Sequence, residues 1–478
     1  MSPGFSRRTF PLLLLVSSTA FHQRAAGATE VNQTQDSTQG PPLEPVAPAP
    51  PVAPGERRPV PDYGRPPPPP PTAREAFLWV PRTLLLPARL TTEYVLVRPT
   101  LAFARWGDQH YVFRRIYDFL TWDNGHSGVY PTASFDLGLK STIGLGLVEG
   151  AFGSSNNSLH ATVSASTQDV LAFSAQDRLR VLRDGTGEVQ LGGGYVRRPD
   201  GIFYGTGADT RSSDKTFYSY ETRALSAGMS GNLGGLHRAA IELGYRDTRI
   251  GGSTIASDTP SLDARYGGAG QPPLPAGWGG YDLAWSRGFL VLDSRSPRFE
   301  DSGSGVRFDA GASFGMSPRD PDLRLLAWQL EAGGYYDLSG ARHVLSLQIA
   351  THFIERIGPS AIPFSELPAL GGQDWMRGFL AGRLRGNSTL VATAEYRYPV
   401  LALVEGELFT ALGNAFADHL ADVSPGRFFL NWGVGLRTTF ARDTGIAATI
   451  AFASNRLDDP AFRIADATRI SLGVIHGF

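Results

Sequence analysis

Arg377 is the residue with the clearest demand on its surroundings. It lies in the segment GGQDWMRGF, residues 371–379, within a long connection between two stretches of alternating apolar and polar residues. A guanidinium that leaves bulk water needs a carboxylate, ideally one that accepts two hydrogen bonds. Glu395 and Glu407 fall on the polar faces of the next two alternating stretches. If the connection folds inward, we therefore expect Arg377 to pair with one of them; otherwise it stays solvated.

The two residues after Arg377 suit a connection that folds inward. Gly378 lets the backbone turn sharply without a Cβ clash. Phe379 is an apolar anchor that we expect to pack against the wall formed by the alternating segments.

Composition gives little support for catalysis, cofactors or nucleic-acid binding. The chain has no cysteine, which excludes disulfides, thiolate metal sites and cysteine nucleophiles. Lys and Arg number 44 against 45 Asp and Glu, so no basic excess is available to neutralise phosphates. No zinc-protease or serine-hydrolase motif stands out, and the nine histidines show no ligand spacing. We expect no enzyme activity, no cofactor and no metal site.

The elements that must position Arg377 are strands, because the sequence has a period of two from residue 130 onward. Phe428, Leu430 and Trp432 alternate with polar or small residues such as Asn431. A strand with this pattern has one apolar and one polar face. The pattern predicts sixteen strands, near 133–140, 143–151, 159–168, 170–182, 187–197, 216–230, 236–249, 282–293, 304–316, 323–338, 341–354, 389–399, 402–417, 428–440, 444–454 and 467–478.

Strand length and connection length favour a transmembrane barrel over a soluble sandwich. Most of these strands reach the 9–11 residues or so that cross a bilayer, whereas sandwich strands more often have about 5–6. Long connections follow odd-numbered strands and short ones mostly follow even-numbered strands, which is how outer-membrane barrels are built. We therefore predict an all-β fold, a sixteen-stranded antiparallel transmembrane β-barrel over residues 130–478, with a short kinked-helical N-terminal extension.

The N-terminal region divides into three predicted segments. Residues 1–28 carry Arg7 and Arg8, a short apolar run and a small-residue cleavage site, as a signal peptide does. Residues 29–72 form a disordered linker rich in proline, which supports neither helix nor sheet. Residues 73–129 are amphipathic and interrupted by prolines, so we expect short kinked helices on the periplasmic side.

The last strand ends in an alternating pattern with a carboxy-terminal Phe. This pattern looks like the terminal signal strand of bacterial outer-membrane barrels. The residues that share one face of this predicted strand are Ile470, Leu472, Val474, His476 and Phe478.

Residues 371–379, together with GRLRG at 382–386 and AEYRYP at 394–399, resemble the BamA/TamA family of outer-membrane proteins, also called the bacterial surface antigen family. The resemblance implies a sixteen-stranded barrel with an Arg-Gly-Phe/Tyr motif on its sixth extracellular loop. The predicted connection 355–388 is that sixth loop. Two features depart from the family: Ala411 stands about where an aspartate commonly meets the arginine, and no periplasmic POTRA domain is recognisable before the barrel.

The resemblance implies a protein of the Gram-negative outer membrane, in contact with outer-membrane lipid, that takes part in membrane-protein insertion, translocation or envelope maintenance. A weakly closed seam between the first and last strands would open sideways. Its partners would be unfolded barrel clients or a separate periplasmic protein. Two alternatives stay open: a passive, porin-like channel, and a surface attachment protein acting through loops 198–215 and 250–281.

Overall fold

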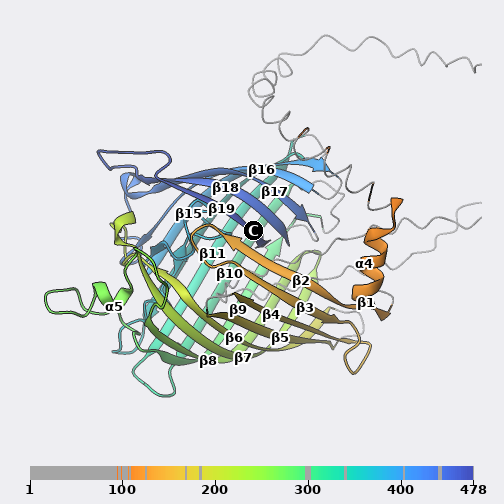
Figure 1. Ribbon diagram of the computed structural model, residues 1–478, viewed down its shortest axis with the longest axis horizontal. Helices are drawn as coiled ribbons and strands as arrows, with labels where there is room; N and C mark the ends of the chain where they lie inside the picture. Colours follow the sequence, from red (N-terminus) through yellow and green to blue (C-terminus); the bar gives the residue numbers. More distant parts are fainter. Residues whose placement is uncertain are drawn as a thin grey trace, which may run out of the picture. The chain divides into compact units, whose positions relative to one another are not determined.

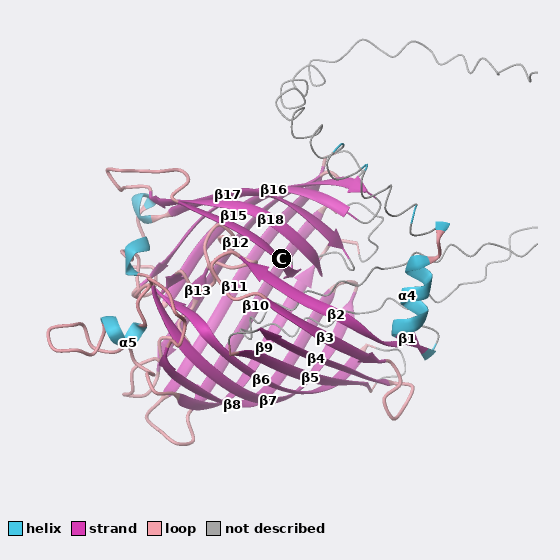
Figure 2. Cartoon of the chain, in the orientation of Figure 1, coloured by secondary structure: helices cyan, strands magenta, loops and turns pink. Residues whose placement is uncertain are grey.

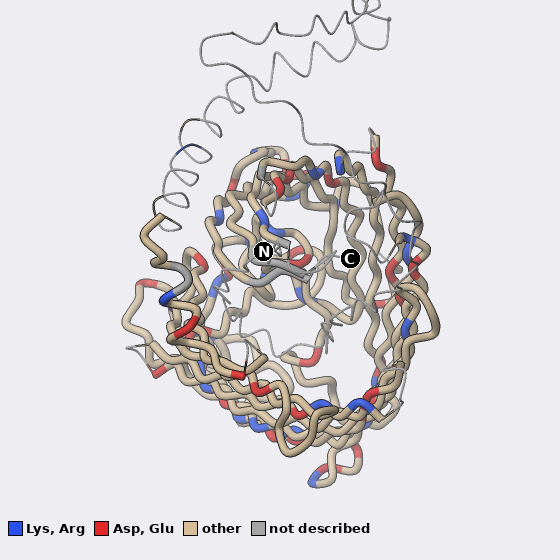
Figure 3. Tube along the Cα trace, turned by 90° about the vertical axis from the view of Figure 1, so that its right-hand side faces the viewer, with Lys and Arg blue, Asp and Glu red and all other residues tan. Residues whose placement is uncertain are grey.

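Sixteen antiparallel strands close on themselves in the computed structural model, and they make up most of the chain that it describes (Figure 1, Figure 2). Turned by 90°, the wall appears as a ring with acidic and basic residues distributed around it (Figure 3). The described residues are 94, 98, 106, 109–123, 126–166, 169–181, 186–296, 303–338, 342–401, 404–421, 423–439 and 444–476.

The barrel strands follow one another around the wall in chain order. They are β2 (Ser127–Asp136), β3 (Thr142–Glu149), β4 (Asn157–Ser166), β5 (Val170–Arg180), β6 (Gly187–Phe203), β7 (Thr216–Gly234), β8 (His237–Gly252), β9 (Tyr281–Asp293), β10 (Gly305–Met316), β11 (Arg324–Asp337), β12 (Val344–Arg356), β15 (Ser388–Leu401), β16 (Val404–Phe416), β17 (Phe429–Thr439), β18 (Thr444–Arg456) and β19 (Ala467–His476).

Short elements accompany the barrel. Two-residue strand β1 pairs with β2, and β13 pairs with β14 inside a loop. Within the described residues there are two short α-helices and two 3-10 turns. The bounds of these short elements are β1 (Thr121–Trp122), β13 (Ala369–Leu370), β14 (Leu384–Arg385), α4 (Val112–Leu120), α5 (Leu262–Arg265), η3 (Ser212–Asp214) and η4 (Pro425–Arg427).

The barrel wall has its apolar side chains on the outside, the reverse of a soluble core. Leu347 and Leu225 are each 68% exposed, whereas inward-facing Glu395 and Asn431 are buried. This is the sorting that period-two alternation predicts when one face meets hydrocarbon and the other an enclosed interior. The predicted sixteen-stranded antiparallel barrel is confirmed.

Most of the long connections lie at one end of the barrel, here called the loop end, at the left of Figures 1 and 2. Counted from β2, the sixth connection at this end is residues 357–387 between β12 and β15, and it is called the sixth loop below. It contains the β13–β14 hairpin. The opposite end is called the turn end, and its connections are mostly short; the longest, between β9 and β10, spans residues 294–304.

The barrel closes between β19 and β2 through a short seam. Within the described residues, two pairs are in register, Ser471 with Asp136 and Leu472 with Phe135. One further backbone bond runs from the Leu137 amide to the Ile470 carbonyl, at 3.0 Å. The neighbouring strands β18 and β19, by contrast, pair at ten positions, along the whole described length of β19. The seam therefore has far fewer backbone hydrogen bonds than the rest of the wall.

Two predicted strand positions are wrong, and proline or glycine explains both. The first strand was predicted at 133–140, but β2 begins at Ser127 and includes Pro131. Proline is tolerated on an edge strand, and β19 pairs only with the last residues of β2. Strand β6 was predicted to stop at residue 197, but it continues to Phe203 across Pro199 through an irregular register between Arg198 and Gly201.

Much of the N-terminal region lies outside the described residues, including the predicted signal peptide 1–28 and linker 29–72. In the predicted helical segment 73–129, the structure describes residues 94, 98, 106, 109–123 and 126–129. Among them α4 is helical as expected, whereas β1 and the first residues of β2 are strand because they pair with each other. Among the described residues, no helix has both the length and the apolar character to span a bilayer.

Candidate functional site in the barrel interior

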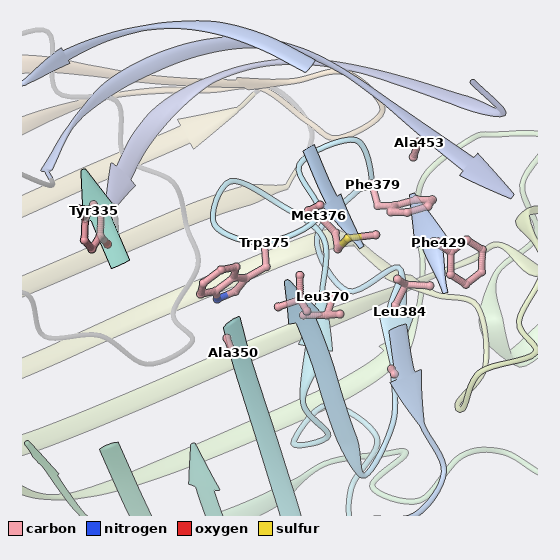
Figure 4. Packing of buried hydrophobic residues seen from close by; sticks show 12 residues of the cluster. Tyr335, Ala350, Leu370, Trp375, Met376, Phe379, Leu384, Phe429 and Ala453 are labelled. Carbon is pink, nitrogen blue, oxygen red and sulfur yellow. The ribbon is translucent and has the colours of Figure 1, made fainter. Parts of the chain in front are cut away.

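The sixth loop is packed inside the barrel. Trp375, Met376 and Phe379 are buried in an apolar cluster with residues of the wall (Figure 4). Phe379 contacts Phe429 of β17 edge to face, with ring centroids 5.5 Å apart. Burying several large apolar side chains stabilises the inward position of the loop by about 1.5–3 kcal/mol for each.

The turn that carries Arg377 depends on two different backbone features. Met376 takes the left-handed conformation, with φ of 55°, and makes the turn itself. Gly378 is required for close approach, because a Cβ there would lie 2.6 Å from the Phe452 carbonyl oxygen of β18. The sharp turn expected at Gly378 is therefore made two residues earlier, by Met376.

Arg377 contacts both carboxylates considered as its partners. Its Nη2 donates to Glu395 Oε2 at 2.9 Å, and its Nη1 donates to Glu407 Oε1 at 3.0 Å. All three side chains are buried. The guanidinium also lies over the ring of Phe409, 4.6 Å from its centroid. Strands β15 and β16 thus supply the two acids, and the loop supplies the cation between them.

A charged network of three arginines and three carboxylates surrounds this contact. Arg397 donates to Glu395, and Arg437 Nε lies 3.9 Å from Glu405 Oε2. Gly435 on β17 leaves room for Glu407, since a Cβ there would lie 2.5 Å from Glu407 Oε1. The network balances its charge, which lowers the cost of keeping six ionised groups away from water.

Ala411 does not take part in this network. It is buried in the apolar cluster, where the resemblance would have placed an aspartate. Glu407 stands four residues toward the turn end on the same strand and supplies the carboxylate instead.

A second arginine, Arg469, joins the sixth loop to the seam. Its Nε and Nη2 donate to the two carboxylate oxygens of Asp136, both at 2.7 Å, across β19 and β2. Its Nη1 donates to the carbonyl oxygens of Gly372 at 2.7 Å and Arg377 at 2.9 Å. Arg469 is 2% exposed. We call this arrangement the seam clamp: Arg469, Asp136 and the two loop carbonyls.

Sequence reasoning missed the seam clamp. Its side chains lie 333 positions apart, and nothing local links them. The available signal was the alternation of side chains along the strand. Ile470 and Leu472 face outward, so Arg469, next to Ile470, faces inward on the predicted closing strand.

The sixth loop is also attached to the opposite side of the wall. Glu366 accepts hydrogen bonds from Arg246 of β8 and Tyr281 of β9. Ser365 lies 2.8 Å from the same tyrosine hydroxyl. Phe364 is buried in a second apolar cluster that includes residues of β7 and β9. The loop therefore crosses the barrel interior between β8–β9 and β15–β19.

Of the predicted terminal strand, Ile470 and Leu472 lie on the outward face, at 43% and 37% exposure. Val474 and His476 belong to β19, but their side chains, like all of Phe478, lie outside what the structure describes.

The described residues show little that suits catalysis. No group of His, Asp and Glu among them is arranged to hold a metal ion. A GxSxG match at residues 311–315 lies within the regular strand β10. A hydrolase nucleophile on this motif needs a strained turn from strand to helix instead.

A family model described as the Omp85 superfamily domain matches residues 139–442. No curated protein sequence matches the chain. Among solved structures, BamA from Haemophilus ducreyi lacking POTRA domains 1-3 is similar, with 12% identity and a TM-score of 0.52 over 73% of this chain and 70% of that one.

Two CdiB structures are also similar. CdiB from Acinetobacter baumannii has 12% identity and a TM-score of 0.44, covering 72% of this chain and 59% of that one. CdiB from Escherichia coli has 14% identity and a TM-score of 0.45, covering 72% and 62%.

Proposed function

The chain belongs to the Omp85 superfamily, and from this premise we propose that it is an outer-membrane protein that inserts or translocates other proteins through its β2–β19 seam. The observation that carries the proposal is the seam itself, with two register pairs and one buried clamp. Opening it sideways breaks few backbone hydrogen bonds. It then exposes strand edges that can pair with an incoming strand.

The seam clamp gives the sixth loop a role in this mechanism. Arg469 satisfies the Asp136 carboxylate and two loop carbonyls together, so separating β2 from β19 disturbs the loop as well. Arg377, Gly378 and Phe379 hold the loop in place on the β15–β18 side. In this proposal the loop locks the closed state, and a client strand or a separate periplasmic partner shifts the balance toward the open state.

The position of the sixth loop weighs against a passive channel. Its buried apolar residues and its attachments to both sides of the wall occupy the interior at the loop end. Surface attachment through residues 198–215 and 250–281 has less support, because part of the first range belongs to β6.

A reversible crosslink across the seam tests the proposal. The chain has no cysteine of its own, so Phe135→Cys with Leu472→Cys places one pair across the seam at registered positions. The matched control, Ala448→Cys with Leu472→Cys, joins the regularly paired β18 and β19. The measurement is the rate at which a urea-unfolded eight-stranded barrel inserts into phosphatidylcholine vesicles that contain each oxidised variant.

Relative to vesicles without the protein, we expect the reduced variants to speed insertion. Oxidation should abolish this acceleration in the seam variant only, and reduction should restore it. Equal rates in the oxidised and reduced seam variant would remove the sideways-opening mechanism.

A further inference from the structure

A groove of about 570 Å³ lies on the outer side of the wall, close to the loop end of β5 and about midway along β6, β7 and β8. Its lining includes Phe173, Gly193, Leu225, Arg223 and Arg319. Phe173 and Leu225 are exposed on the outward face. Gly193 stands opposite Leu225 in the register and has no side chain; a Cβ there would lie 3.1 Å from Leu225 Cδ2.

The height of the groove follows from the outward residues of β7. From Leu225 to Leu233 this face is apolar, which is nine residues, and about 9–11 are needed to cross a bilayer. Arg223 is the next outward residue toward the loop end. The groove therefore spans the border between the hydrocarbon and the lipid headgroups, with its apolar part on the hydrocarbon side.

Guanidinium groups dominate the headgroup side of the groove. The side chains of Arg223, Arg249 and Arg319 are 58–65% exposed. Their carboxylate neighbours are recessed: Glu221 is 25% exposed and Asp282 is 2% exposed. Arg197 of β6 and Asp247 of β8, a recessed carboxylate, lie on the same outward side. Arg223 is paired with Glu221, and Arg319 with Asp247 and Asp282. A ligand that approaches from the membrane meets positive charge first.

We propose that this groove binds a phosphorylated, acylated lipid of the outer leaflet. One acyl chain lies over Gly193 between Phe173 and Leu225, and a phosphate lies against Arg223 and Arg319. Arginine matches phosphate with paired hydrogen bonds, and the apolar floor holds the chain that a free phosphate lacks. The inference rests on the proposed membrane location and not on insertion activity.

Lipid A, which carries phosphates and several acyl chains, is the probe. Purified full-length protein in detergent is titrated with lipid A, and bound copies are counted by native mass spectrometry. Arg223→Gln removes a headgroup contact, and Gly193→Leu fills the floor of the groove. The matched controls are Arg324→Gln, an exposed arginine at the loop end of β11, and Gly288→Leu, an outward glycine of β9.

We expect one retained lipid A per chain, affinity about fivefold lower in Arg223→Gln, a larger loss in Gly193→Leu, and no change in the controls. Phosphatidylcholine should not be retained. Heat-modifiable migration on a gel reports barrel closure in each variant; if Gly193→Leu does not close, Arg223→Gln against Arg324→Gln decides. Equal lipid A affinity in these two, or equal retention of phosphatidylcholine, would overturn the proposal.

Discussion

Arg377 has its charge shared between two acids instead of one. The guanidinium sits between Glu395 and Glu407 and is covered by Phe409. Breaking a buried charged contact typically costs about 3–5 kcal/mol, because the remaining charge is left without a partner. The side chain therefore holds the sixth loop inward more strongly than a surface arginine could.

A double-mutant cycle measures this contact. Arg377→Gln, Glu395→Gln and Glu407→Gln should each lower the free energy of unfolding, and each double variant should lose less than the sum, by roughly 1–3 kcal/mol. Urea unfolding in vesicles, followed by tryptophan fluorescence, gives the values. Glu331→Gln is the control acid, since Glu331 is buried on β11 and bonds His352. Coupling near zero for both partner acids would show that Arg377 is energetically independent of them.

At the residue scale, the sequence can predict which residues meet when the alternation along the strands and the length of the connection are enough to bring them together. Arg377 lies in a long connection and Glu395 and Glu407 face inward, so their proximity follows once the loop folds in. The contact of Arg469 with Asp136 requires the register of the closing strands, which no local pattern contains. Met376 is missed for a similar reason, because its left-handed φ is imposed by packing.

At the seam between β2 and β19, one buried side-chain pair adds to the few backbone hydrogen bonds. A charge-assisted contact with paired hydrogen bonds is roughly twice as strong as a neutral one. The buried Arg469–Asp136 pair therefore offsets part of the missing ladder between the two strands.

Removing the clamp should loosen the seam and the sixth loop together. In Arg469→Gln, we expect faster amide hydrogen exchange in β2, in β19 and around residues 372–377. The control is Arg307→Gln, which breaks an arginine–aspartate pair on β10, away from the seam. In the control, faster exchange should be confined to the surroundings of β10. Unchanged exchange at the seam in Arg469→Gln would contradict the role given to the clamp.

At the element scale, alternation predicts strands well because a two-faced wall constrains every second residue. The predicted strand at 282–293 differs by one residue from β9. The errors fall where proline interrupts the pattern, at Pro131 and Pro199, while neighbouring strands still hold the backbone extended. Local sequence cannot report that support.

The part of the chain that the structure describes is mainly a barrel whose interior is crossed by one of its own loops. The sixth loop contacts β8–β9 through Glu366 and β15–β16 through Arg377. A porin-like channel needs an open path, whereas a protein that opens sideways needs the loop end obstructed while the seam moves.

Planar-bilayer conductance separates these two cases. The native chain should give small, fluctuating currents. Replacing residues 360–386 with a short glycine linker should give large, steady currents, because a sixteen-stranded wall encloses a water-filled lumen once the loop is removed. Large, steady currents from the native chain would favour the passive channel.

The most direct test of the account is the distance across the seam. Spin labels at Ile143→Cys and Ile450→Cys sit on exposed outward positions of β3 and β18, one strand beyond the seam on either side. Double electron–electron resonance in lipid nanodiscs should give one narrow distance for the native clamp and an added longer distance in Arg469→Gln. Identical distance distributions in the two proteins would contradict a seam that the clamp keeps closed.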